Sequence, residues 1–373
     1  MPGLTQTKST VASVTGSTPG CAVTARRRWV TALALSIALI WLGALPAGAA
    51  AHGPVAPVAT SYLARVTRTP AGVDAKVVDG DLRMWLRVPA SMTVVIIDYR
   101  GAPYLRFSRS GVQVNQNSAM YYINQVPPVT PPISLGPGTA PRWRRVSAGH
   151  SYLWQDGRLQ ALARTVLAPG TSYAGRWSIP LRVRGRVEAI TGGLYHSPGP
   201  SLVWFWPIVV LLACVMAAWR IRRPALDARV ARVLGGVALL GVAVAGTARQ
   251  LHGRPLVSDF QLVELAAILA FVVWGVRQAL LKRPGYFTYF VISLAALWEG
   301  IELIPTLTHG FVLTAAPALV ARASAVLCLG AGAGLLPFVF RLVREFAEPA
   351  MRPATDAVDG RNPDPREEVW GRG

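Results

Sequence analysis

The stretch YFTYFVISLAALWEGIELIPTLTHG, residues 286–310, decides how the rest of the chain is interpreted. Its apolar run is long enough to cross the hydrocarbon core of a bilayer, which takes about 20 residues. Yet Glu299 and Glu302 lie within that run. A charged side chain at membrane depth costs several kcal/mol, roughly 2.5–3.5 kcal/mol for Asp on insertion scales. The stretch therefore predicts a membrane span whose carboxylates need a partner, water or a proton.

The composition of the whole chain favours the same class. Of its 373 residues, 52% are hydrophobic and 15% are charged, whereas soluble domains average about 25% charged residues. The formal charge of +20 is assigned to basic segments beside spans and to contact with anionic lipid headgroups. No nucleic-acid-binding motif accompanies that charge. We therefore expect the lipid bilayer as a partner and no nucleic acid.

The first 51 residues have the layout of an export signal. Three arginines at 26–28 precede an apolar run over residues 29–45, and small residues follow at 47–51. A basic region, an apolar region and an A-x-A-like site are the parts of a signal peptide. The apolar run is slightly longer than a usual signal core, so an uncleaved anchor helix is the alternative. Both interpretations place the chain after about residue 52 outside the cytoplasm.

Residues 52–200 are expected to form an extracytoplasmic β domain. Short runs rich in Val, Ile, Tyr and Trp alternate with turn signals such as Asp79-Gly80-Asp81, a pattern that predicts an antiparallel sandwich. The three cysteines of the chain lie outside this region, so it must fold without disulfides. Residues 126–141 are too rich in proline for a central strand and predict a long loop.

A basic repeat closes the predicted β domain. Arg182, Arg184 and Arg186 alternate along the chain, and on one strand they would share a face. We expect that face to contact lipid headgroups, at about 1 kcal/mol per residue near an anionic surface. A solvated strand face is the equal alternative.

Five apolar runs predict a transmembrane bundle over residues 201–344. The expected spans are about 202–219, 230–248, 256–281, 286–304 and 315–340. The links assigned to the cytoplasm are basic, as the positive-inside rule requires. Residues 345–373 predict a disordered cytoplasmic tail. The expected fold is an α+β plasma-membrane protein with a signal or anchor helix, an extracytoplasmic antiparallel β-sandwich-like domain and a C-terminal five-helix bundle.

Charged residues inside the predicted spans form the main candidate site. At 1.5 Å per residue, they fall in the outer half of the bundle. They are Asp259, Glu264, Glu299, Glu302 and Arg322, with Arg249, His252 and His309 at the outer ends. Glu299 and Glu302 share a helix face. The cluster predicts a proton relay or an outward-facing cation or ligand site; the alternative is a structural ion pair of Glu299 with Arg322.

Other signals of chemistry are few. Cleavage after Ala51 would leave His52 as the N-terminal residue, whose amine and imidazole nitrogens suit copper(II). The other four histidines have no ligand spacing. The sequence contains no Walker A, dinucleotide-binding, G-x-S-x-G or H-E-x-x-H motif. We therefore expect no enzyme and no cofactor, with copper at His52 as the alternative.

Three stretches resemble those of a group of uncharacterised actinobacterial membrane proteins. They are residues 97–107 (IDYRGAPYLRF), 112–124 (VQVNQNSAMYYIN) and 141–158 (PRWRRVSAGHSYLWQDGR). The resemblance covers about residues 60–340 and implies an exported strand-rich domain followed by five spans. In the group the third stretch carries histidines, close to W-H-D-H-R. This chain has Gln155 and Gly157 in their place, so a metal site there would have lost its ligands.

Two hypotheses for function follow. The first is a non-enzymatic envelope protein whose extracytoplasmic domain binds an envelope protein or a small ligand. The second is the handling or transport of a cation, copper or the proton, through the carboxylates in the outer half of the spans.

Overall fold

The structure is a computed structural model, and it describes residues 57–163, 167–168, 170–221, 224–281 and 285–351. The predicted signal or anchor segment and His52 lie outside the described residues. So does the chain after residue 351.

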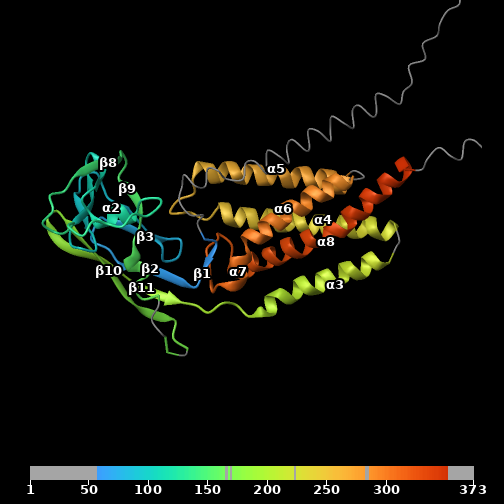
Figure 1. The fold of residues 1–373 in the computed structure, drawn as a ribbon, viewed down its shortest axis with the longest axis horizontal. Coiled ribbons are helices and arrows are strands. Elements are labelled where there is room, and N and C mark those ends of the chain that lie inside the picture. Colours follow the sequence, from blue (N-terminus) through green and yellow to red (C-terminus); the bar gives the residue numbers. More distant parts are fainter. Residues whose placement is uncertain (1–56, 164–166, 169, 222–223, 282–284, 352–373) are drawn as a thin grey trace, which may run out of the picture. The chain divides into compact units, whose positions relative to one another are not determined.

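The first part of the described chain is built from strands (Figure 1). The strands are β1 (Ala59–Thr60), β2 (Tyr62–Arg68), β3 (Asp74–Val78), β4 (Arg83–Arg87), β5 (Val94–Ile97), β6 (Pro103–Ser108), β7 (Gly111–Asn115), β8 (Trp143–Ser147), β9 (Ser151–Gln155), β10 (Tyr173–Val183) and β11 (Arg186–His196). A short helix, α2 (Ala119–Ile123), and a 3-10 turn, η2 (Gly157–Leu159), interrupt them. The expected strand-rich region is thus confirmed.

All of these strands except β1 form two antiparallel sheets. A seven-stranded sheet has the order β2-β11-β10-β5-β6-β7-β8, and a three-stranded sheet has the order β3-β4-β9. Both sheets contribute to one apolar cluster, in which Leu86 and Trp154 of the small sheet join Ile96 and Leu181 of the large one. Alternation sets which residues enter it, since Trp177 and Ile179 of β10 are buried while Ser178 between them is exposed. Residues 126–141 contain neither strand nor helix, as their prolines predicted.

The basic repeat does not lie on one strand, so that prediction was wrong. Arg184 and Gly185 have positive φ angles of 49° and 84° and form the turn between β10 and β11. This is the two-residue hairpin turn that an X-Gly pair favours. Arg182 therefore pairs with Val187, and Arg186 pairs back with Val183. The tip also lies at the end of β11 away from Ser197, about 33 Å along an 11-residue strand. The three arginines therefore do not form the single face that was expected to contact lipid headgroups.

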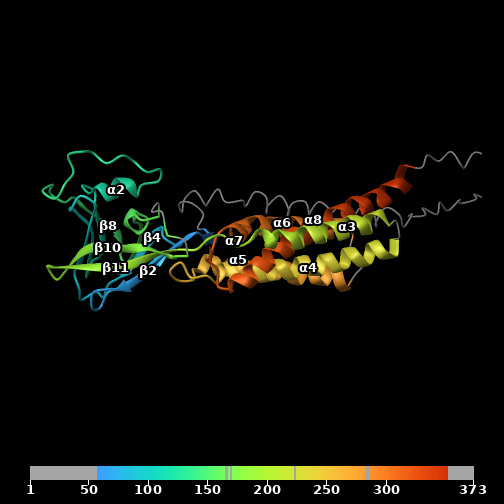
Figure 2. The same ribbon diagram turned by 90° about the horizontal axis from the view of Figure 1, so that it is seen from below.

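The second part of the described chain is helical. After a 3-10 turn, η3 (Leu202–Phe205), come α3 (Trp206–Arg220), α4 (Pro224–Gln250), α5 (Asp259–Leu281), α6 (Tyr286–Glu302), α7 (Ile304–Thr308), a two-residue strand β12 (Phe311–Val312) and α8 (Ala318–Met351). The long helices run alongside one another in both views (Figures 1 and 2). The last helix continues to Met351, so residues 345–351 are helical in place of the disorder expected for them, and the rest of the predicted tail lies outside the described residues.

Four helical segments in the described residues are long and apolar enough to cross a membrane, in place of the five expected. They are Leu202–Arg220, Leu226–Gln250, Asp259–Ala279 and Ala318–Arg341. The fifth expected span is shorter, because α6 has 17 residues and ends at Glu302. The chain then starts α7 with Pro305 in its first turn. Proline lacks the amide hydrogen that would continue the ladder of α6.

Small residues bring the helices together. The hydroxyl of Ser293 on α6 donates a 2.6 Å hydrogen bond to the carbonyl of Gly332 on α8. Gly300 of α6 lies against Leu329 of α8 so closely that an added Cβ would meet that leucine at 2.8 Å. Such contacts are typical of helices that pack without large side chains between them. In contrast, α3 and α5 expose many large apolar side chains, among them Val210 and Val273.

Candidate functional site

The predicted polar cluster is centred on Arg249, in the last turn of α4. The Nη2 atom of Arg249 lies 2.8 Å from Oε1 of Glu299, and its Nη1 atom lies 3.7 Å from Oε2 of Glu302. Both carboxylates lie at the C-terminal end of α6, where the helix dipole disfavours negative charge. Glu299 is only 5% exposed, so its charge needs a partner. One guanidinium group therefore offsets two carboxylates.

The expected ion pair of Glu299 with Arg322 is wrong. Arg322 donates instead to three main-chain carbonyl groups, those of Thr306 at 2.9 Å, His309 at 3.3 Å and Gly310 at 3.1 Å. These carbonyls follow the break between α6 and α7, where helical hydrogen bonding stops. A guanidinium group has five N–H donors in a fixed fork and suits several acceptors at once. This role of Arg322 was not predicted, because the break between α6 and α7 was not expected.

The remaining predicted residues do not join these arginines in one site. Asp259 is exposed in the first turn of α5. Glu264 is half-buried and close enough to act electrostatically on Glu299. The ring nitrogen Nδ1 of His309 lies 3.1 Å from the carbonyl of Pro305. Among the described residues, no three His, Cys, Asp or Glu side chains gather as metal ligands would.

His252 lies in the link between α4 and α5, and the side chain of Gln261 forms hydrogen bonds to the backbone of this link. The Nε2 atom of Gln261 donates to the carbonyl groups of Gln250, at 3.0 Å, and His252, at 3.1 Å. Burial first, and then the charge of Arg254, lower the pKa of His252. The imidazole is therefore neutral at neutral pH.

The strand-rich and helical parts share a small sheet. Ala59 pairs with Val312 and Thr60 pairs with Phe311, so that β1 and β12 form an antiparallel ladder. The amide of Leu313 adds a 2.7 Å hydrogen bond to the carbonyl of Val58. This ladder joins segments about 250 residues apart in sequence. It directly follows the carbonyl groups that Arg322 holds, so the arginine fixes the segment that leads into β12.

A second attachment lies at the turn between β3 and β4. Asp79 forms an ion pair with Arg83 and acts electrostatically on both His252 and Arg254 of the α4–α5 link. Its neighbour Asp81 is buried, and that burial raises the pKa of Asp81 to about 6. The Asp-Gly-Asp sequence indicated the turn but not its charged surroundings.

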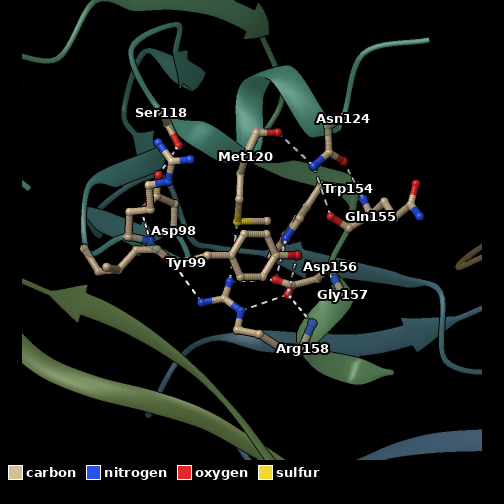
Figure 3. A network of polar contacts seen from close by, with 12 residues as sticks. Asp98, Tyr99, Ser118, Met120, Asn124, Trp154, Gln155, Asp156, Gly157 and Arg158 are labelled. Atoms are coloured by element: carbon tan, nitrogen blue, oxygen red, sulfur yellow. Dashed lines mark hydrogen bonds and ion pairs between the residues drawn. The ribbon is translucent and has the colours of Figure 1, made fainter. Parts of the chain in front are cut away.

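A separate polar network lies within the strand-rich part (Figure 3). The fully buried carboxylate of Asp156 accepts hydrogen bonds from Nε1 of Trp154 at 3.0 Å and from Nε and Nη2 of Arg158 at 2.8 and 2.7 Å. The Arg158 guanidinium also donates to the carbonyl of Ile97 and lies 5.1 Å from the ring centre of Tyr99. Burial first, and then the charge of Asp156, raise the pKa of Tyr99 to about 12. The phenol therefore stays protonated.

Asp98 and Asn124 complete this network. The two oxygens of Asp98 accept from the amides of Arg100 and Ala102, both at 2.8 Å, and from the hydroxyl of Ser118 and the amide of Ala119. The Nδ2 atom of Asn124 donates to the carbonyl of Gln155, and its Oδ1 atom accepts from the amide of Gln155. These contacts hold α2 against the loop after β5 and the end of β9.

The network brings together residues from three stretches that are separate in the sequence. Asp98 and Tyr99 belong to residues 97–107, Ser118 and Asn124 to residues 112–124, and Asp156 to residues 141–158. Asp98 and Asn124 bond mostly to backbone groups, and Ser118 donates to Asp98, so these residues support the fold. Gln155 and Gly157 are both exposed beside Asp156.

No family model, curated protein or solved structure matches this chain.

Proposed function

We propose that the chain is a membrane-anchored binding protein of the cell envelope. Its strand-rich part is the binding domain, and its helices, with α6 and α7 together as a fifth span, are the anchor. The exposed apolar side chains of α3 and α5 support the anchor, since lipid would cover them. We place the strand-rich part outside the cytoplasm, as the basic links at 220–223 and 282–283 indicate.

The observation that carries this proposal is the ladder between β1 and β12. A strand-rich domain joined to helices by one linker alone would move freely relative to them. Here a second connection, made of backbone hydrogen bonds, fixes the domain to the segment between α7 and α8. The charged residues near it serve this connection: Arg322 holds the segment, and Arg249 neutralises the end of α6.

We do not propose cation transport. Two of the four carboxylates expected to carry it, Glu299 and Glu302, face the guanidinium group of Arg249, whose positive charge would repel a cation. Copper binding by His52 stays an untested prediction, because His52 lies outside the described residues.

The placement can be tested by labelling single cysteines in intact cells. Ser110→Cys puts a thiol on the exposed turn between β6 and β7, in a background where the three native cysteines are replaced by alanine. We expect a membrane-impermeant maleimide to label it without lysis. Gly373→Cys in the same background is the matched control and should react only after lysis. The reverse pattern would overturn the proposal.

A further inference from the structure

The outer face of β2, β11 and β10 carries a groove that the proposed function does not yet use. It has a volume of about 460 Å³ and is lined by Arg68, Tyr173, Arg176, Thr191, Gly193 and Tyr195, among others. The opposite face of the same strands is closed, because Trp177, Ile190 and Leu194 enter the apolar core. The groove is therefore a surface feature of the strand-rich part.

A row of three residues across the strands shapes the groove. Gly193 of β11 pairs with Arg176 of β10 on one side and with Arg65 of β2 on the other. Neighbouring strands lie about 4.8 Å apart, so the two arginines flank the glycine with roughly 10 Å between their Cα atoms. Because Gly193 has no side chain, the rings of Tyr173 and Tyr195 pack above it, between the two arginines. An added Cβ at Gly193 would meet the ring of Tyr173 at 2.9 Å and that of Tyr195 at 3.2 Å.

The exposed charged residues around the groove are basic. Arg65, Arg68 and Arg176 are all exposed, and β2 and β10 contain no acidic residue. Residues 57–200 as a whole contain 17 Lys and Arg against six Asp and Glu. Guanidinium groups bind carboxylate, sulfate and phosphate groups in a bidentate manner. Arg176, which lines the groove, and Arg65, which lies beside it over the ring of Tyr195, thus have the charge to hold one acidic group from two sides of the tyrosine rings.

Two further features indicate a ligand larger than a single ion. Tyr173 and Tyr195 form a tilted ring pair with centres 5.5 Å apart, and Tyr173 is 51% exposed. Thr191, on the floor of the groove, is 7% exposed, and its buried hydroxyl oxygen has no hydrogen-bond partner within the described ranges. An unpaired buried hydroxyl is costly, and a ligand oxygen that reached the floor would satisfy it.

We infer that this groove binds an acidic polysaccharide, with a carboxylate, sulfate or phosphate between Arg65 and Arg176 and the adjoining sugar ring against the tyrosines. Tyrosine offers an apolar ring and a polar hydroxyl, which suits a sugar ring with apolar faces and hydroxyl edges. Arg65 lies 5.4 Å from the ring centre of Tyr195, so the exposed ring of Tyr173 is the one open to the sugar. The choice of a polysaccharide rests on the proposed extracytoplasmic position.

The test measures binding of a size-fractionated heparin oligosaccharide to the purified full chain in neutral detergent at low salt, by titration calorimetry. We expect Arg65→Ala with Arg176→Ala to weaken binding at least 30-fold. The matched control, Arg142→Ala with Arg145→Ala, removes the same charge around β8, at the other edge of the sheet. It should change affinity less than threefold. The variant with Arg65→Lys and Arg176→Lys keeps both positive charges but lacks the guanidinium groups that bind an acidic group in a bidentate manner. Its loss of heparin affinity should be intermediate.

The outcomes that would overturn the inference are specific. They are no heparin binding by the native chain, equal losses in the two alanine pairs, or equal binding of uncharged dextran. Stronger competition by oligothymidylate, or by vesicles containing phosphatidylglycerol, would assign the groove to nucleic acid or to lipid instead. Because this measurement uses purified protein, its failure is independent of the cysteine labelling that tests the position of the domain.

Discussion

Two buried ion pairs, one in each part of the molecule, show how differently the two parts use charge. In the strand-rich part, Asp156 pairs with Arg158 two residues away, and both oxygens of its carboxylate accept hydrogen bonds. In the helical part, Glu299 pairs with Arg249, 50 positions away, and its Oε2 atom has no hydrogen-bond partner within the described residues. The first pair completes a local network, whereas the second holds two helix ends together.

Two buried ion pairs of similar chemistry thus have different structural roles. A buried pair is weak support for stability in itself, because desolvation opposes the attraction. Hydrogen bonds from Trp154 and Arg158 offset that cost at Asp156. At Glu299 the compensation comes from Arg249 alone. The strand-rich pair should therefore tolerate loss of its acid less well than the helical pair.

The largest effect is expected for Asp156→Ala. It leaves the mostly buried Arg158 without its carboxylate and Trp154 Nε1 without its acceptor. Breaking such a pair costs about 3–5 kcal/mol. Thermal unfolding of the full chain in detergent, followed by near-ultraviolet circular dichroism, should show a clear fall in Tm. A change within error would mean that the network contributes little.

A smaller effect is expected for Glu299→Gln. Arg249 then keeps Glu302 as a partner, 3.7 Å away, so we expect a loss of about 2 kcal/mol, below the range for a pair that is broken outright. Glu302→Gln, which removes the longer contact, is the matched control and should cost less. If the control proved the more damaging change, the assignment of Glu299 as the main partner would be wrong.

Arg322→Lys should weaken the connection between the two parts by about 1–2 kcal/mol. Lysine keeps the positive charge but cannot reach three carbonyl groups as a guanidinium fork does. Hydrogen exchange at Phe311–Leu313 should accelerate while exchange in the core of β10 and β11 stays unchanged. Uniform acceleration along the chain would point to global destabilisation instead.

The smallest effect concerns pH. Burial raises the pKa of Asp81 from its ordinary value of 3.8 to about 6 in the folded chain. The fold therefore favours the neutral acid, and this contribution is present below pH 4 and is lost as the pH rises through 6. Asp81→Asn keeps the group neutral. It should raise stability at pH 7.5 by about 1 kcal/mol, since solvent screens part of the effect, and change little at pH 4.

Local sequence determined much of the architecture. The alternation on β10, the prolines of residues 126–141 and the apolar runs of α3, α4, α5 and α8 predicted their own conformation, because each signal is complete within a few turns or strand residues. The same reasoning failed where one residue changes the chain direction. Arg184-Gly185 turned an expected strand into a hairpin, and the break after Glu302 shortened an expected span.

An unpaired buried carboxylate is too costly, so the need of the charged residues near Glu299 for partners follows from their place in an apolar run. That Arg249 is the partner of Glu299, and that Arg322 binds the chain before β12, depends on the folded arrangement of the helices. Pairing across many residues depends on how helices are rotated and where they end. Those are properties of packing, and no local pattern of residues encodes them.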